Sequence, residues 1–260
     1  MGYAIFWHER VMLLNTLTFY LGEDSPALQY AKTFLKEYGC RFSSTPDRSV
    51  THCLLPVPSI NGSGQLRSRI PIEQLPEDCI LIGGKLPSEL STTHSTWDLL
   101  QDEYYLAQNA AITAHCAVKE ALSRMDVTLQ DCPVLIIGWG RIGKCLGQLL
   151  QAIGARVAIA ARKEKDLTLL QSLNFTALSM EKLTAEARKY AVIFNTVPSP
   201  VLHSDHCAKD SLLIELASST GIEGDRVVQA RGLPGKDAPR SSGVLIGQTI
   251  LRLLKKEETL

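Results

Sequence analysis

Short apolar runs alternate with amphipathic helical patterns along the chain, and this alternation predicts parallel α/β sheets. In the first half, apolar and β-branched runs indicate strands at residues 17–21, 50–55 and 79–82. Between the first two runs, apolar residues recur at helical spacing from Ala27 to Leu35, with Ser25 as the expected N-cap and Pro26 at the first helical position.

A second set of strand patterns follows a long helical stretch, at residues 134–137, 156–161, 192–194 and 212–216. We therefore predict an α/β fold with two Rossmann-like or flavodoxin-like parallel-sheet domains and a cleft between them. The expected boundaries are an N-terminal substrate-side domain at 1–105, an interdomain helix at 106–126, a Rossmann domain at 127–240 and a C-terminal helix at 241–260 that packs back toward the first domain.

The most informative motif is the run from Val134 to Gly143, in which four apolar residues precede a G-x-G-x-x-G pattern and a helix. Gly138 permits the tight turn off the strand, Gly140 lets a pyrophosphate approach the backbone, and Gly143 lets the helix pack close to the strand. The candidate dinucleotide-binding residues here are Gly138, Trp139, Gly140, Arg141, Ile142 and Gly143. The alternative is a glycine-rich turn that only packs a helix on a sheet.

The residues after the next strand bear on the choice of nucleotide. Enzymes selective for NAD usually place an acidic residue there, whereas this chain has Arg162 and Lys163 after Ala161. Both side chains are able to pair with a 2′-phosphate, which favours NADP over NAD; the alternative is a pair of solvated surface cations.

Two further strands of this domain end in small polar residues at the ligand edge of the predicted sheet. The candidates for the nicotinamide side are Asn195, Thr196, Val197, Pro198 and Ala217. Glu215 interrupts the apolar run before Ala217 and either bonds backbone or sugar groups or faces a polar edge.

Substrate-side residues are expected on loops of the first domain and near the last helix. Pro56, Gly83 and Gly84 follow strands of the first domain, although ordinary connections explain them equally well. We expect residues 232–235 to form a tight loop, and Ser241 and Ser242 to open a helix at 244–254 whose N-terminus forms an anion site beside Lys236 and Arg240. The alternative is a helix start with surface cations.

Composition narrows the function further. The chain has 260 residues, 27 basic and 27 acidic side chains and no net charge, which argues against nucleic acid or an anionic membrane as its main partner. Its seven cysteines show no metal-ligand spacing, so we expect reduced thiols, no metal and a cytoplasmic protein. The first 21 residues show neither a secretory signal nor a membrane span.

Several stretches together resemble the A subunits of bacterial dipicolinate synthase. The resemblance rests on residues 54–57, 134–143, 160–162, 194–199 and 216–218, and above all on Gly232-Leu-Pro-Gly235 with Ala238-Pro239 and Gly243 before the final helix. The fold is also similar to that of 2-hydroxyacid dehydrogenases. The chain departs from the family in its shorter first domain, in residues 108–113, at Lys236, and in residues 218–221, where an Arg-Pro-Gly run is missing.

The resemblance implies an NADP-dependent oxidation of a dihydrodipicolinate-type ring, a small dicarboxylate, to dipicolinate. It also implies a partner, the flavoprotein-like B subunit of the synthase, and the cytoplasm of the mother cell of a sporulating bacterium; a homo-oligomer is left open. The candidate catalytic residues are Arg240, as a carboxylate ligand, and His115, which a packed or solvated helix residue explains as well. The alternatives are a dehydrogenase for another small carboxylate and a non-catalytic nucleotide-binding regulator.

Overall fold

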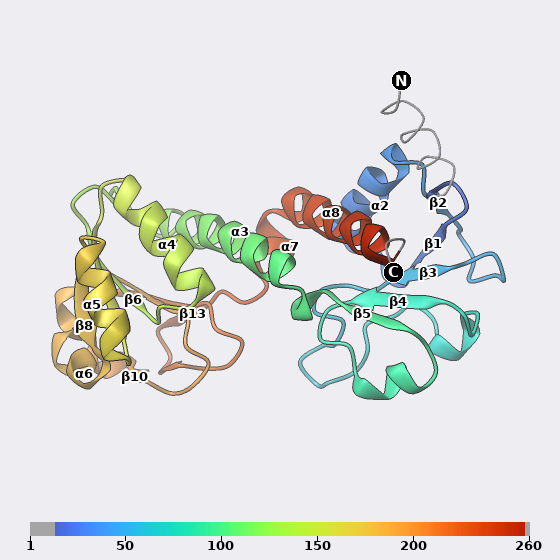
Figure 1. Ribbon diagram of the computed structural model, residues 1–260. Helices are drawn as coiled ribbons and strands as arrows, with labels where there is room; N and C mark the ends of the chain where they lie inside the picture. Colours follow the sequence, from blue (N-terminus) through green and yellow to red (C-terminus); the bar gives the residue numbers. More distant parts are fainter. Residues whose placement is uncertain (1–13, 258–260) are drawn as a thin grey trace, which may run out of the picture. The chain divides into compact units, whose positions relative to one another are not determined.

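The computed structural model describes residues 14–257, which form two compact units (Figure 1). One unit comprises residues 14–109 together with 238–257, and the other comprises residues 110–237. Helix α3 (Glu103–Leu122) begins in the first unit and ends in the second. The expectation for the N-terminal segment concerns residues 1–13 in large part, and these lie outside the described residues.

The first unit is built on a parallel sheet with the strand order β2-β1-β3-β4-β5. Its strands are β1 (Thr18–Leu21), β2 (Arg41–Phe42), β3 (His52–Leu54), β4 (Ile80–Gly83) and β5 (Thr96–Asp98). Helices α2 (Pro26–Glu37) and α8 (Pro239–Glu257) pack side by side on one face of this sheet (Figure 1). Short 3₁₀ helices cover the other face, namely η1 (Ile72–Gln74), η2 (Ser88–Thr92) and η3 (Leu99–Gln101).

Local sequence explains why α2 forms where it does. Ser25 caps the helix, since its Oγ accepts a hydrogen bond from the Leu28 amide at 3.4 Å, and Pro26 occupies the first turn, as predicted. The apolar face of α2 is buried, and Gly243 of α8 approaches it so closely that a Cβ there would lie 2.8 Å from the Ala31 amide nitrogen.

The second unit is built on a parallel sheet with the strand order β13-β11-β9-β6-β7-β8. Its strands are β6 (Pro133–Ile137), β7 (Arg156–Ala161), β8 (Thr176–Ser179), β9 (Val192–Asn195), β11 (Leu212–Glu215) and β13 (Val227–Gln229), and a separate parallel pair joins β10 (Leu202–His203) to β12 (Ile222–Glu223). The connecting helices are α4 (Arg141–Ala152), α5 (Glu164–Ser172), α6 (Leu183–Glu186), η4 (Met180–Lys182), η5 (Ala187–Lys189) and η6 (Ser204–His206). The prediction of two parallel α/β sheets is confirmed.

Three helical segments differ from the sequence expectation. Helix α3 ends at Leu122 rather than at 126, because the Ser123 hydroxyl donates to the Glu120 carbonyl and competes with further helical turns. The expected tight loop at 232–235 is part of a short helix, α7 (Leu233–Asp237). Helix α8 begins at Pro239, five residues before the expected start at Val244, because proline fits the first turn of a helix.

Within residues 14–257, no helix combines the length and the apolar character that crossing a membrane requires.

Candidate functional site

The loop between β6 and α4 has the geometry of a phosphate-binding turn. Gly138 has a φ of +107°, a conformation that side chains disfavour. A Cβ at Gly143 would collide with the Gly138 carbonyl, so this glycine permits the close packing of α4 on the strand end. Gly140 faces open space, since a Cβ there would meet no atom within 4 Å.

The start of α4 fits an anion. Gly140 is its N-cap and offers no side chain to the first-turn amides, which carry the positive end of the 12-residue helix. An open glycine at a helix N-terminus on the carboxyl edge of a parallel sheet is the arrangement that receives a dinucleotide pyrophosphate.

The side chain of Trp139 packs against the protein. Its ring meets Phe175 edge-on, with centroids 5.7 Å apart, and the Lys144 ammonium lies 5.8 Å from the ring centroid. Its indole Nε1 is buried without a hydrogen-bond partner among the described residues. Of the candidate residues in this turn, Trp139 thus has a structural role for its side chain.

Arg162 and Lys163 lie at the end of β7, next to β6. Both are exposed, and their side chains bond to no residue within 14–257. Two cations at the end of the neighbouring strand are placed to meet the ribose end of a dinucleotide whose pyrophosphate lies on α4.

Asn195 and Glu215 form a buried network at the ends of β9 and β11, and both residues are fully buried. Glu215 accepts hydrogen bonds from the amides of Ala217, Gly221 and Ile222 at 2.8–3.0 Å and from Asn195 Nδ2 at 2.8 Å. Of the two interpretations of Glu215, the structure supports bonding to backbone.

The Asn195 amide group has its other contacts within its own loop. Nδ2 donates to the Val197 carbonyl at 2.9 Å and Oδ1 accepts from the Val197 amide at 3.0 Å, so the side chain shapes the loop from inside. Asn195 is therefore a positioning residue rather than a cofactor contact, because no part of its side chain reaches the surface.

The half-buried Thr196 joins this loop to the glycine turn, since its Oγ1 donates to the Ile137 carbonyl at 2.9 Å. Val197 is half-buried and Pro198 is exposed beside it, whereas Ala217 is buried and its amide is held by Glu215. The strand-end loops of β6, β9 and β11 are thus bonded to one another at a single edge of the sheet.

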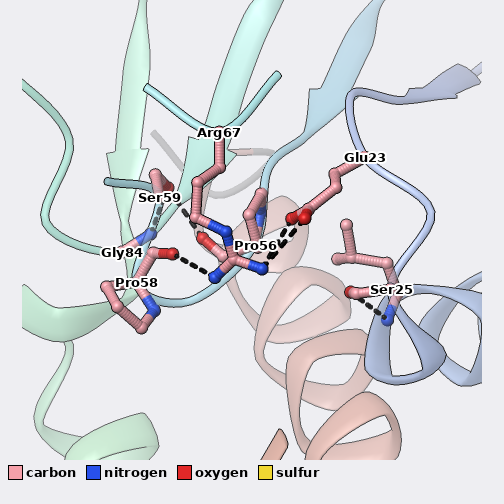
Figure 2. Close-up of polar contacts among 8 residues, drawn as sticks. Glu23, Ser25, Pro56, Pro58, Ser59, Arg67 and Gly84 are labelled. Atoms are coloured by element: carbon pink, nitrogen blue, oxygen red, sulfur yellow. Dashed lines mark hydrogen bonds and ion pairs between the residues drawn. The ribbon is translucent and has the colours of Figure 1, made fainter. Parts of the chain in front are cut away.

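The first sheet has a second polar cluster at its carboxyl edge (Figure 2). The buried Ser59 hydroxyl donates to the Pro56 carbonyl at 2.8 Å and accepts from the Gly84 amide at 3.0 Å. A Cβ at Gly83 would collide with that hydroxyl, and one at Gly84 would lie 2.6 Å from Val57 Cγ1. Pro56, Gly83 and Gly84 are thus brought together, and this packing alone accounts for both glycines.

Arg67 reaches the same edge, and the sequence patterns did not single it out. Its Nη2 donates to Glu23 Oε1 at 3.0 Å and its Nη1 donates to the Pro58 carbonyl at 3.2 Å (Figure 2). An acidic residue directly after the first strand and a basic residue after a Gly-Ser-Gly loop were the available signals.

Helix α8 starts at the end of the first unit where these loops lie. Gly243 contacts the first turn of α2 and Gly247 contacts Phe34 near its middle, so α8 runs parallel to α2. Arg240 and Ser241 lie exposed in the first turn of α8.

The prediction that Ser241 and Ser242 open this helix is wrong. The Ser242 amide already donates to the Ala238 carbonyl at 3.0 Å, and its side chain is buried. An anion at this helix start would therefore meet the amides of Arg240 and Ser241 instead.

The two remaining candidates are exposed. Lys236 lies on α7 in the second unit, and His115 lies on α3 with no hydrogen-bond or ion-pair partner among residues 14–257. The described part of the chain also holds no cluster of three or more histidine, cysteine or acidic side chains suited to a metal ion.

Comparison with known proteins agrees with this geometry. Residues 101–201 match the family model of the D-isomer specific 2-hydroxyacid dehydrogenase, NAD binding domain. The second unit is therefore similar to an NAD(P)-binding domain, and the 2-hydroxyacid dehydrogenase-like fold that the sequence predicted for it is confirmed.

Relatives match along most of the chain. The A subunit of dipicolinate synthase from Bacillus subtilis (strain 168) is 22% identical over 241 residues, which cover 83% of this chain and 81% of the relative. The crystal structure of the corresponding dipicolinate synthase protein from Bacillus halodurans superposes with a TM-score of 0.81 at 21% identity, covering 93% of this chain and 98% of the other. A transhydrogenase from Sinorhizobium meliloti has a TM-score of 0.69 at 12% identity, covering 92% of this chain and 94% of the other.

Proposed function

We propose, from the premise that this chain is a homologue of the dipicolinate synthase A subunit with an NAD(P)-binding domain, that it is an NADP-dependent oxidoreductase. The proposed reaction is the oxidation of a dihydrodipicolinate-type ring to dipicolinate. By the same analogy, a flavoprotein-like B subunit is its partner and the mother cell of a sporulating bacterium is its setting.

The observation that carries the proposal is the uncapped start of α4 beside the strand-end loops of β6, β9 and β11. In this reaction the dihydro ring loses a hydride to the bound nicotinamide and a proton to a base, and aromatisation supplies the driving force. The chain's own contribution is to bind and align the two reactants.

Each part of the site has a role in this scheme. The backbone of Gly138 and Gly140 and the first turn of α4 hold the pyrophosphate, while Arg162 and Lys163 pair with the 2′-phosphate. The Asn195–Glu215 network holds the loops that face the nicotinamide. Arg240 binds a substrate carboxylate, and the exposed imidazole of His115 is the proposed proton acceptor.

The test is calorimetric titration of the purified chain with NADPH and, separately, with NADH. We expect NADPH to bind more tightly, and Arg162→Asp to weaken NADPH binding about tenfold to a hundredfold while NADH binding stays nearly unchanged, because only NADPH carries the 2′-phosphate. Lys209→Asp is the matched control, since this exposed cation lies before β11, at the opposite edge of the sheet.

Two outcomes would count against the proposal. Binding of neither nucleotide would overturn the oxidoreductase function of this chain. Tight NADPH binding without turnover of the dihydro ring, alone or with a B subunit, would instead favour the nucleotide-binding regulator.

A further inference from the structure

An arginine that the proposed function leaves unused lies at the carboxyl edge of the second sheet. Strand β13 pairs with β11 so that Gln229 lies opposite Glu215, and Arg231 follows two residues later. Its side chain turns back over the loop that follows β11: Nε donates to the Ala217 carbonyl at 3.1 Å and Nη2 donates to Thr220 Oγ1 at 3.2 Å.

These two bonds fix the guanidinium and leave it with free donors. Nη1 has no partner among the described residues, the side chain pairs with no carboxylate there, and the residue is half-buried. A guanidinium that is already oriented and still has free N–H groups loses little entropy when a carboxylate binds to it.

Arg226, near the same loops, shows the contrasting case. Its Nη1 and Nη2 donate to the carbonyls of Ser204, Ala208 and Lys209 at 2.6–3.1 Å, so its donors serve the backbone. The two arginines therefore differ in role, because Arg226 stabilises a turn whereas Arg231 is held in place with a donor to spare.

The strand order gives the free donor its meaning. The pyrophosphate site lies at the end of β6, and the cations Arg162 and Lys163 lie on one side of it, at β7. Arg231 lies on the other side, three strands from β6, which corresponds to roughly 14 Å at the usual strand spacing. A dinucleotide with its 2′-phosphate toward β7 places its nicotinamide toward β9 and β11, so Arg231 is next to the reacting end, where the cofactor has no phosphate.

We infer that Arg231 is a specificity-determining residue that binds a carboxylate of the substrate. This inference rests on the proposed function, because it is the bound dinucleotide that gives the β11 side of the edge its reacting end. Ala217 and Thr220 position the guanidinium, and the buried Glu215 fixes the backbone on which they lie.

The test uses two probes of the same shape and different charge, pyridine-2,6-dicarboxylate and pyridine-2,6-dicarboxamide, titrated into the full chain saturated with NADP⁺. We expect the wild-type chain to prefer the dicarboxylate. Arg231→Met should weaken dicarboxylate binding about tenfold to a hundredfold and leave diamide binding nearly unchanged. Arg231→Lys should retain part of the preference, since it keeps the charge and loses the planar fork.

Controls separate ligand binding from loop structure. Thr220→Val removes one bond to the guanidinium and keeps the charge, so the preference for the dicarboxylate should survive. Arg188→Met removes an exposed cation from η5, before β9, and should change neither titration.

Three results would overturn the inference. Arg231→Met with the wild-type ratio of the two affinities would show that the arginine does not contact the carboxylate. An equal loss for both probes would show that it only supports the loop. A wild-type chain that binds NADP⁺ but not the dicarboxylate would remove the ligand class and leave the nucleotide site intact, whereas a chain that binds no NADP⁺ would overturn the proposed function itself.

Discussion

His52 on β3 is a titratable group inside the first unit, and its burial makes stability depend on pH. The side chain is 3% exposed, stacks on Phe19 with centroids 4.8 Å apart and has a buried Nε2 without a partner among the described residues. Burial disfavours the charged form and lowers the pKa of His52 to about 4.

The sign of the effect follows from the unfolded chain, in which the pKa of a histidine is near 6.5. Above that value both states are neutral and stability is complete. As the pH falls from about 6.5 toward 4, the unfolded state takes up a proton that the folded state does not, so the free energy of unfolding should drop by on the order of 3 kcal/mol in total.

His52→Phe should flatten the pH dependence of urea unfolding between about pH 6.5 and pH 5, a window above the usual carboxylate pKa values. Phenylalanine fits between the rings of Phe19 and Trp97 but loses the contact of 2.8 Å between His52 Nδ1 and Thr51 Oγ1, so its stability at pH 8 is compared separately. His115→Phe on the exposed side of α3 is the control. An unchanged slope in His52→Phe would show that His52 titrates normally.

Glu215 leads to a second prediction at this scale. Its four hydrogen-bond partners are all N–H donors, and this matches a carboxylate that only accepts. Glu215→Gln keeps the shape but sets an NH₂ group against those donors, so calorimetric unfolding should show a loss of about 2–4 kcal/mol. Glu223→Gln, at an exposed position on β12, should stay close to wild type. If Glu215→Gln were as stable as wild type, the carboxyl group would be protonated.

At this scale the sequence predicted location better than contact. The patterns placed Asn195 and Glu215 at strand ends, because strand periodicity fixes position along the chain. They did not show that these two side chains bond to each other and to loop amides, because that depends on the neighbouring order of β9 and β11. Arg231 escaped notice for the same reason, since its partners are on another strand-end loop.

At the scale of elements, the β6–α4 unit was predictable because its signals are local: a buried run, three spaced glycines and a helical pattern. The start of α8 was misplaced because Ser241 and Ser242 look like N-caps, whereas Pro239 begins the helix two residues earlier. Both serines are compatible with a first turn, so the sequence alone did not distinguish the two starts.

The contact between α2 and α8 gives an element-scale prediction. A Cβ at Gly243 would lie 2.6 Å from Tyr30 Cβ and 2.8 Å from the Ala31 amide nitrogen, and backbone atoms cannot rotate away. Gly243→Ala should therefore lower the free energy of unfolding by about 1–3 kcal/mol despite the better helix propensity of alanine. Gly235→Ala in α7 is the control, since a Cβ there meets no atom within 4 Å. Equal stability of the two variants in urea would show that α8 packs more loosely on α2.

At the scale of the whole molecule, the chain order and the folding units differ. Residues 14–109 build the first sheet, and the helix that covers it beside α2 comes from residues 239–257, after the second unit is complete. The packing of a distant segment depends on three-dimensional contacts, yet the glycines at 243 and 247 that permit it were visible in the sequence.

This arrangement predicts different behaviour for two fragments. Residues 103–237 contain all of α3 and the second unit, with its own sheet and buried core, and should fold alone, unfold cooperatively and bind NADPH. Residues 1–109 lack α8, so the apolar face of α2 and its neighbours are left uncovered, and this fragment should be unstable or aggregate.

The decisive measurement is complementation. Adding residues 238–260 in trans, or joining them to residues 1–109 by a flexible linker, should restore cooperative unfolding, because it returns the helix that packs against α2. The same segment carrying Gly243→Ala should complement less well, since the substituted helix cannot approach Ala31 as closely. A stable fragment 1–109 without the added segment would show that α8 contributes little to the first unit, and would then also remove the reason to expect a large effect from Gly243→Ala in the full chain.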